Sequence, residues 1–246
     1  LDDSQAETVM RLRYRLIAAD LAALGIDCNC APVVDVRFAQ THPVIGMRAY
    51  GTSAARVSLL ARAAWDGLTA GGVLPVIKHL PGHGRANRDS HLALPVVEAP
   101  RADLEAVDFA AIKPLADAPM GMTAHILYTA LDPDACATFS PKVIGLLRRE
   151  IGFRGLLMTD DISMGALSDP MGERVHKALA AGCDMILHCN GDRAEMAAVA
   201  AAAPTLEGPA ASRAAAALAA RKPPQPFDAA EALAALRDLG GGPVDA

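Results

Sequence analysis

Aromatic side chains are scarce in this chain of 246 residues. Phe, Trp and Tyr make up 4% of it, whereas hydrophobic residues as a whole make up 52%. Much of the apolar content is alanine, which is typical of amphipathic helices. The hydrophobic fraction excludes an intrinsically disordered chain, and the length suits one large domain or two small ones.

Positive charge is also limited, and no long hydrophobic run is present. The net charge is −5 at pH 7 and the basic residues form no stripe, so we expect no nucleic-acid partner. No apolar run reaches the ~18 residues that a membrane-spanning helix needs, so we expect no insertion into a membrane. The sequence shows neither a signal peptide at Leu1 nor an initiator methionine, so the missing leader carries little information.

The five cysteines are irregularly spaced. An odd number without a regular pattern argues against a disulfide framework and favours a reducing cytoplasm. Cys28 and Cys30 have no second pair at zinc-finger spacing, so we expect no metal site there. The other three are Cys136, Cys183 and Cys189.

Short apolar runs alternate with segments of helical periodicity along the chain. The expected strands cover residues 28–36, 73–79, 120–126, 155–159 and 185–189. The expected helices cover residues 6–24, 54–70, 101–116, 141–150 and 173–181, followed by Ala-rich helices that are broken at 204–209 and 222–226. We expect residues 240–246 to form a frayed tail.

This alternation predicts a parallel α/β architecture. The Gly-x-Gly-x-x-Gly turn of an open dinucleotide-binding sheet is absent after the first expected strand, so we favour a (β/α)8 TIM-type barrel. A closed barrel needs eight strands, and the pattern contains only about five. We therefore expect a barrel that lacks about three strands on its N-terminal side in this chain.

Polar residues gather where the expected strands end, which is the ligand-binding face of barrels and of open α/β sheets. They are Asp35, Lys78, His79, His125, Asp160, Asp161, His188 and Asn190. The segment after the second expected strand, KHLPGHGRANRDSH at residues 78–91, is especially rich in titratable groups. A solvated surface loop is the alternative, but the lysine and the first histidine follow directly on an apolar run.

Two groups in this set suit catalysis. A carboxylate at the end of a strand, such as Asp160 or Asp161, can act as nucleophile, general base or metal ligand, although one of the two could simply cap the next helix. Asp89 and His91 lie two positions apart, so an extended loop would point them the same way. A carboxylate beside an imidazole fixes its tautomer and raises its basicity; a loop held by its own hydrogen bonds is the alternative.

The combined motifs resemble glycoside hydrolase family 3, and more closely its bacterial β-N-acetylhexosaminidases of the NagZ type, which act in peptidoglycan recycling. The carrying segments are KHLPGHG at 78–84, DSH at 89–91 and MTDDISM at 158–164. Supporting segments are APVVDV at 31–36, IGMR at 45–48, MTAH at 122–125 and AGCDMIL at 181–187. Together they run in order over roughly residues 10 to 192.

The resemblance implies a role for six residues. Asp160 matches the nucleophile that forms a covalent glycosyl-enzyme, and His91 matches the acid/base, with Asp89 as its dyad partner. Sugar-binding positions of the family are matched by Arg48, Lys78 and His79. His83 is expected to shape the loop and Asp161 to support the site, while Asp35 and His125 receive no role.

One family segment is missing: the Asp-Gln-Glu-Gly-Gly-Arg-Val sequence of an early strand, whose Asp and a following Arg bind the non-reducing sugar. Its absence agrees with the low strand count, so we expect residues 1–246 to be a single family 3 catalytic barrel domain without its N-terminal part. If Leu1 is the true start, part of a sugar subsite is absent.

As function, the resemblance implies a cytoplasmic, monomeric, retaining exo-β-N-acetylglucosaminidase without cofactor or metal. It would remove the non-reducing terminal GlcNAc of GlcNAc-anhydro-muramoyl peptides, a small muropeptide substrate. A family 3 β-glucosidase or a glycoside phosphorylase is the alternative within the same class. Alternatives of other classes are an inactive sugar-binding fragment and a metal-binding module made of His79, His83, Asp89 and His91.

Overall fold

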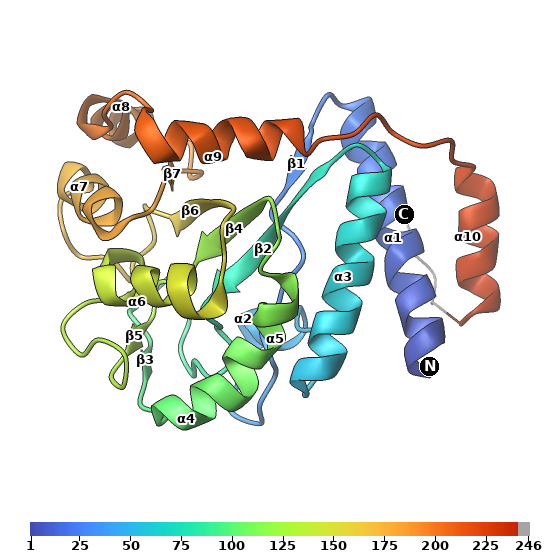
Figure 1. Ribbon diagram of the computed structural model, residues 1–246, viewed down its shortest axis with the longest axis horizontal. Helices are drawn as coiled ribbons and strands as arrows, with labels where there is room; N and C mark the ends of the chain where they lie inside the picture. The colour runs from blue at the N-terminus through green and yellow to red at the C-terminus, as the bar shows by residue number, and fades with distance from the viewer. Residues whose placement is uncertain (241–246) are drawn as a thin grey trace.

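A five-stranded parallel sheet forms the centre of the computed structural model, which describes residues 1–240. Its strands are β1 (Cys28–Asn29), β2 (Leu74–Leu80), β4 (Met120–Thr123), β6 (Leu156–Asp161) and β7 (Met185–Leu187). They lie side by side in chain order, β1-β2-β4-β6-β7 (Figure 1). A doubly wound sheet reverses its strand order at a switch point, and this sheet shows no such reversal. It is a singly wound sheet that curls into a half-barrel.

The described residues do not close an eight-stranded barrel. Besides the five-stranded sheet, they form a two-stranded parallel ribbon of β3 (Val96–Val97) and β5 (Leu127–Tyr128), which the sequence pattern did not predict. The predicted parallel α/β class and the number of strands in the main sheet agree with the structure. The (β/α)8 TIM-type barrel, of which we expected this chain to lack about three strands, is not confirmed, because the described sheet is a half-barrel with free edges at β1 and β7.

Helices cover both faces of the sheet. They are α1 (Asp3–Ala23), α2 (Pro43–Gly46), α3 (Ala54–Ala70), α4 (Arg101–Asp103), α5 (Ala110–Ile112), α6 (Pro141–Leu146), α7 (Met171–Ala181), α8 (Arg193–Ala202), α9 (Gly208–Ala219) and α10 (Ala229–Asp238). Shorter or irregular helical segments are η1 (Leu104–Phe109), η2 (Lys113–Leu115), η3 (Ala137–Phe139) and η4 (Leu147–Ile151). At one end of the molecule, α1 lies beside α3 and α10 lies beside α1 (Figure 1).

The outer face of the sheet packs against α3, α5, α6 and α7. Ile77 of β2 and Leu157 of β6 are fully buried there, together with Ile112 of α5 and Ala178 of α7. Right-handed crossovers between neighbouring parallel strands place all of their helices on one side. The largest hydrophobic cluster therefore lies between the sheet and these helices.

Helix α9 covers part of the inner face. Alternate residues of three neighbouring strands form a second apolar cluster there: Leu74, Val76, Met120, Met122, Leu156 and Met158. Ala217 of α9 is buried in this cluster, and Arg213 of the same helix donates from Nε to Asp184 Oδ2 at 2.9 Å. Asp184 also accepts from Arg148 and from the N–H of Leu157, so one buried carboxylate ties α9 to both the sheet and η4.

Several element boundaries differ from the expectation. The strand predicted at 28–36 pairs regularly only over Cys28–Asn29, with an isolated bridge from Val33 to Lys78, because Pro32 has no N–H to donate to a ladder. The helix predicted at 101–116 contains the π-helical segment η1. The first helix begins at Asp3, since Asp2 and Gln5 form a capping box. The tail expected at 240–246 lies, beyond Gly240, outside the described residues.

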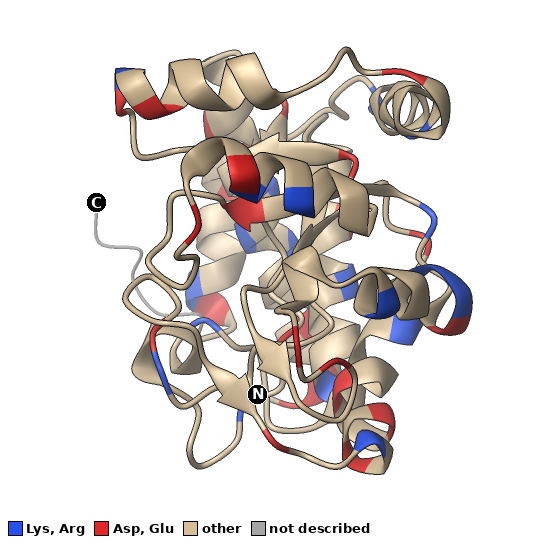
Figure 2. Ribbon diagram, turned by 90° about the vertical axis from the view of Figure 1, so that its left-hand side faces the viewer, with Lys and Arg blue, Asp and Glu red and all other residues tan. Residues whose placement is uncertain are grey.

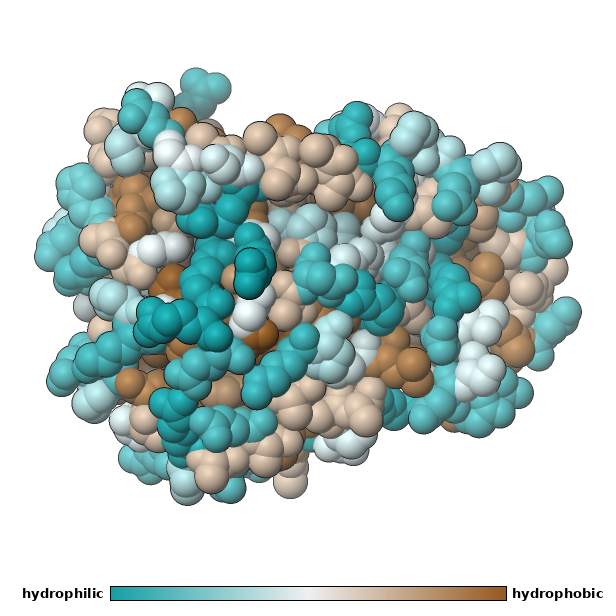
Figure 3. Space-filling view, in the orientation of Figure 1, coloured by the Kyte–Doolittle hydropathy of each residue, from teal (hydrophilic) through white to brown (hydrophobic). Residues whose placement is uncertain are grey.

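The surface is of mixed charge and polarity. Lys and Arg segments are interspersed with Asp and Glu segments (Figure 2), and the face shown in Figure 3 is mainly hydrophilic with small separate apolar areas. In the described part of the chain, no helix combines the length and the hydropathy that crossing a bilayer requires.

Truncating a core leucine tests the packing of β6 on the outer helices. Leu157→Ala is expected to lower the free energy of unfolding by about 2–5 kcal/mol, because it removes a side chain with no exposed surface and leaves a cavity. Urea denaturation followed by circular dichroism measures the difference. The matched control is Leu218→Ala on α9, whose side chain is 66% exposed and whose loss is expected to change stability by less than about 0.5 kcal/mol. Equal effects of the two substitutions would contradict this packing.

Candidate functional site

The two neighbouring aspartates at the end of β6 have different partners. Asp161 Oδ1 accepts the N–H of Ser163 at 3.1 Å and that of Cys189 at 3.3 Å, while its Oδ2 accepts the Ser163 hydroxyl at 2.7 Å. Burial raises the pKa of Asp161, but these hydrogen bonds outweigh it and lower the pKa below its usual value. Asp161 is thus bonded within the turn that follows it. Among residues 1–240, the one hydrogen bond that Asp160 accepts comes from the N–H of Asp161 to Oδ1, and Oδ2 is directed towards His79 of β2.

At the end of β2, His79 approaches Asp160, and Lys78 lies within range of its charge. The ladder between β2 and β4 changes register between Ile77 and Leu80, and such an irregularity interrupts the strict alternation of side chains. His79 Nε2 lies 3.9 Å from Asp160 Oδ2. Burial lowers the pKa of Lys78, and Asp160 is among the nearby groups that act on its charge. The structure therefore brings Lys78, His79 and Asp160 together.

Arg48 lies at the edge of this group. It follows α2, is exposed, and donates from Nη1 to the Val44 carbonyl at 3.3 Å. Its positive charge acts on Lys78 and lowers the pKa of that amine further. Arg48 and Lys78 are therefore close enough for their charges to interact, while the Arg48 side chain faces solvent.

Asp89 and His91 form a pair on the exposed loop that follows β2. His91 Nδ1 lies 2.7 Å from Asp89 Oδ1, and the backbone N–H of His91 donates to the same oxygen at 2.9 Å. These hydrogen bonds lower the pKa of Asp89. The His91 side chain is 57% exposed. Among the described residues, no hydrogen bond or ion pair joins this dyad to Asp160.

Backbone hydrogen bonds fasten the dyad loop to the turn after β6. The N–H of Gly165 donates to the His91 carbonyl at 3.0 Å, and the N–H of Ala166 donates to the Ser90 carbonyl at 3.1 Å. A Cβ atom at Gly165 would lie 2.8 Å from the His91 oxygen, so this approach requires glycine. Because Gly165 follows Asp160 by five residues, the segment carrying Asp160 also supports the dyad loop.

The base of the loop is ordered by His83. Its ring Nε2 pairs with the Ser90 hydroxyl at 3.1 Å, and burial lowers its pKa to about 4. The imidazole is therefore neutral near pH 7. Its buried Nδ1 has no hydrogen-bond partner in the part of the chain that the structure describes.

Two further buried residues contribute to the site, although the sequence suggested no role for them. His125 pairs with Thr138 at 2.7 Å and with the Asp161 carbonyl at 3.0 Å, which holds the end of β6 in place. Asp35 accepts from the ring of His79 and from the backbone of His83. Their positions at strand ends were visible in the sequence, but their partners lie 13 to 48 residues away.

The metal-binding alternative finds no support in the geometry. Within residues 1–240, no three histidine, cysteine or acidic side chains converge in an arrangement that could hold a metal ion. The rings of His79 and His83 lie edge to face at 5.3 Å between centroids. Asp35 contacts the ring of His79 and the backbone N–H of His83, while Asp89 pairs with His91 on the loop.

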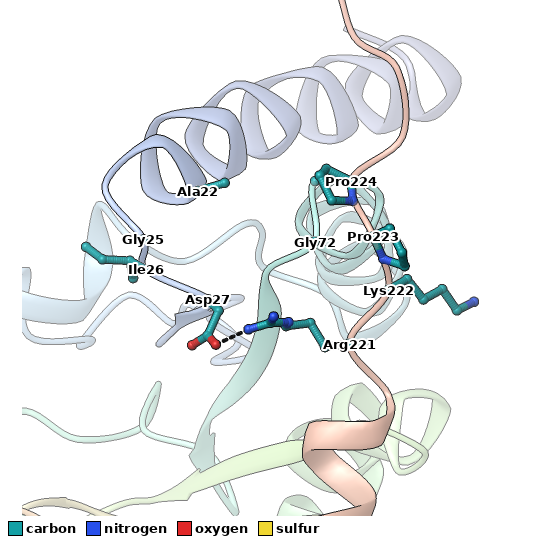
Figure 4. Close-up of a pocket in the computed structure, with 10 residues that line it drawn as sticks. Ala22, Gly25, Ile26, Asp27, Gly72, Arg221, Lys222, Pro223 and Pro224 are labelled. Carbon is teal, nitrogen blue, oxygen red and sulfur yellow. Dashed lines mark hydrogen bonds and ion pairs between the residues drawn. The ribbon is translucent and has the colours of Figure 1, made fainter.

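A cavity of about 570 Å³ lies at the opposite end of the sheet and contains none of the predicted site residues. Figure 4 shows that it is bordered by the segment before β1 and by the chain that follows α9, with an ion pair between Asp27 and Arg221. Asp27 precedes β1 and Gly72 precedes β2, so this cavity marks the amino ends of the strands. The candidate site lies at their carboxyl ends, as parallel α/β folds dictate.

Comparison with known proteins identifies a family to which this chain is similar. Residues 3–219 match the glycosyl hydrolase family 3 N terminal domain. The chain is 40% identical over 194 residues to a beta-hexosaminidase of Alkalilimnicola ehrlichii, which covers 77% of this chain and 55% of that protein. It is 37% identical over 191 residues to a beta-hexosaminidase of Neisseria meningitidis serogroup B, which covers 76% of this chain and 53% of that protein.

Solved structures give the same result. NagZ from Neisseria gonorrhoeae in complex with N-trifluoroacetyl-D-glucosamine superposes with a TM-score of 0.78 at 31% identity, covering 96% of this chain and 68% of that one. A family 3 β-N-acetylglucosaminidase from a Paenibacillus species gives 0.76 at 31% identity, covering 98% and 47%.

The chain spans about half the length of the curated relatives that it matches. The family match nevertheless extends over most of the described residues, from α1 to α9, and includes the ends of β2 and β6 where the predicted site residues converge. On these grounds, the chain belongs to glycosyl hydrolase family 3.

Proposed function

We propose that this chain carries the catalytic residues of a retaining exo-β-N-acetylglucosaminidase. The observation that carries the proposal is the convergence of Lys78 and His79 on Asp160, with the Asp89–His91 dyad on a loop fastened to the turn after Asp160. The relatives named beta-hexosaminidase and the neighbour bound to N-trifluoroacetyl-D-glucosamine support an N-acetylglucosamine unit as the recognised sugar.

In the first step, Asp160 Oδ2 attacks the anomeric carbon of the terminal sugar. The bond from that carbon to the glycosidic oxygen breaks, and the protonated His91 imidazole gives its proton to the departing oxygen. Asp89, hydrogen-bonded at Nδ1, stabilises the imidazolium form of His91 before this transfer. The products of the step are the released aglycone and a glycosyl ester on Asp160.

In the second step, the neutral His91 accepts a proton from water, whose oxygen attacks the anomeric carbon and releases Asp160 as a carboxylate. Two displacements at one carbon leave the β configuration unchanged. The exposed position of His91 suits this exchange with water, and closure of its loop on the bound sugar would bring the dyad to the bond being broken.

Arg48, Lys78 and His79 are proposed to hold the sugar. A guanidinium, an ammonium and an imidazole can together donate to and accept from several hydroxyl groups, and such contacts fix the ring in a reactive orientation. The substrate that we propose is the GlcNAc-anhydro-muramoyl peptide of cell-wall turnover. The compartment that we propose is the reducing cytoplasm, supported by five cysteines that are all free thiols.

Removing the proposed nucleophile is expected to abolish turnover. Asp160→Ala should lower kcat/KM on 4-nitrophenyl β-N-acetylglucosaminide by about 10³-fold or more, since no other group would form the glycosyl ester. Release of 4-nitrophenol measures the rate, and mass spectrometry of quenched wild-type protein locates the sugar adduct. The control is the neighbouring Asp161→Asn, which keeps one acceptor oxygen for the turn and is expected to lose less than about tenfold. A larger loss in Asp161→Asn than in Asp160→Ala would reverse the assignment.

Replacing the proposed acid/base should make the rate depend on the leaving group. His91→Ala is expected to slow glycosides with a poor leaving group by about 10²–10⁴-fold, because the departing oxygen then leaves without a proton. The first step with 2,4-dinitrophenyl β-N-acetylglucosaminide needs no proton and should be nearly unaffected in pre-steady-state measurements. His176→Ala on α7 is the control, since that histidine is exposed and distant in sequence from the site motifs. An equal loss on both substrates would argue against His91 as the acid.

Phosphate distinguishes hydrolysis from phosphorolysis. If water is the acceptor, as proposed, inorganic phosphate at millimolar concentration should leave the rate of 4-nitrophenol release unchanged and the free sugar should be the only sugar product. Chromatography detects the sugar products. Formation of a sugar 1-phosphate would show that the enzyme is a phosphorylase and not a hydrolase.

A further inference from the structure

Asp35 is a fully buried carboxylate in the segment that follows β1. Its two oxygens have separate partners. Oδ1 accepts the backbone N–H of His83 at 2.6 Å and that of His79 at 3.2 Å. Oδ2 lies 2.7 Å from ring Nδ1 of His79. One oxygen therefore binds the main chain at the end of β2 and in the turn after it, and the other binds the imidazole that faces Asp160.

The two oxygens of Asp35 meet different requirements: Oδ1 accepts the backbone N–H groups that hold the turn, and Oδ2 binds the His79 ring. The N–H groups that meet Oδ1 could be satisfied by the oxygen of an amide, which is neutral. A buried carboxylate is costly unless a partner compensates its charge. A carboxylate, in place of a neutral amide, is thus required only for the bond between Oδ2 and the His79 ring. Burial raises the pKa of Asp35, but the ring of His79 and the N–H of His83 outweigh it and hold the pKa below its usual value.

The bond to Asp35 determines which nitrogen of His79 faces the nucleophile and in which form. A carboxylate can only accept, so Nδ1 must carry a proton. Nε2, 3.9 Å from Asp160 Oδ2, is then the nitrogen that the neutral ring offers as an acceptor. A sugar hydroxyl entering beside Asp160 can donate to this lone pair.

We propose that Asp35 is a positioning residue that fixes the ring and the tautomer of His79, so that Nε2 accepts a hydroxyl of the sugar held at Asp160. The proposal rests on the function proposed above for Asp160 and His79. Asp35 itself is buried beneath His79 and acts on the reaction only through that imidazole.

The substitution Asp35→Asn inverts the hydrogen bond with little change in shape. The amide oxygen can take the place of Oδ1 and keep both backbone donors, while the NH₂ group takes the place of Oδ2 and donates to Nδ1. His79 must then carry its proton on Nε2, where the hydroxyl of the sugar needs an acceptor. We expect kcat/KM on 4-nitrophenyl β-N-acetylglucosaminide to fall at least about tenfold, the lower end of what the loss of an orienting carboxylate costs.

Two further readouts distinguish positioning of His79 from a purely structural role of Asp35. The ¹⁵N chemical shifts of the His79 ring, assigned with His79→Gln, should show a protonated Nδ1 in the wild type and a protonated Nε2 in Asp35→Asn. If Asp35 acts through His79, the double variant Asp35→Asn/His79→Gln should be no slower than His79→Gln alone, within about twofold.

Asp184→Asn is the matched control. Asp184 is also a buried carboxylate that accepts a backbone N–H and side-chain donors, but it precedes β7 at the opposite end of the sheet. We expect it to lower the midpoint of thermal unfolding while the folded protein keeps the wild-type kcat/KM and the wild-type tautomer of His79.

The outcomes are separable. A proton on Nε2 of His79 in the wild-type protein overturns the inference. A proton that remains on Nδ1 of His79 in Asp35→Asn overturns it as well. If the variant does not fold, the wild-type spectrum alone still tests which nitrogen carries the proton. Additive losses in the double variant overturn it as well. If the wild-type protein has no N-acetylglucosaminidase activity, the proposed function fails, and the ¹⁵N comparison still tests the hydrogen bond between Asp35 and His79.

Discussion

The pleat of a parallel sheet is the constraint on which the arrangement of this molecule depends. Successive side chains of a strand alternate between its faces, so Leu74, Val76 and Lys78 of β2 share the inner face, as do Leu156, Met158 and Asp160 of β6. The first two members of each set are apolar and lie beneath α9, and the third is the charged residue at the strand end. The same periodicity thus produces the apolar floor and places Lys78 and Asp160 above it.

The site depends equally on a local departure from that periodicity. Strict alternation would send His79 to the outer face, among the side chains of α3 and α5. The register change between Ile77 and Leu80 instead leaves His79 near Asp160, and the buried carboxylate of Asp35 holds the ring there. The buried carboxylate of Asp35 therefore supports the polar residues of the site, while hydrophobic packing beneath α9 supports the apolar residues below them. The two layers are stabilised by different forces, and a change in one need not disturb the other.

These layers explain what could be predicted from the sequence. Apolar runs that end in Lys78 and in Asp160 give the strands, their parallel order and the edge where ligands bind, because these depend on local patterns. The apolar segment at residues 28–36 suggested a long strand, but Pro32 interrupts the pairing, and this requires knowledge of the neighbouring strand. The pairing of Asp35 with His79 and of His125 with the Asp161 carbonyl joins segments that are far apart in the chain, so no local pattern could reveal either.

The fastening of the dyad loop has a consequence for how such a site can diversify. The loop is joined to residues 165 and 166 through main-chain N–H and C=O groups, which every residue except proline provides. Apart from the glycine that this close approach demands, the junction is largely indifferent to side-chain identity. Mutation can therefore change the length or the acid/base group of this loop while Asp160 keeps its place at the end of β6. In evolutionary terms, the proposed proton donor lies on a part of the chain that can be replaced, and the proposed nucleophile is part of the scaffold.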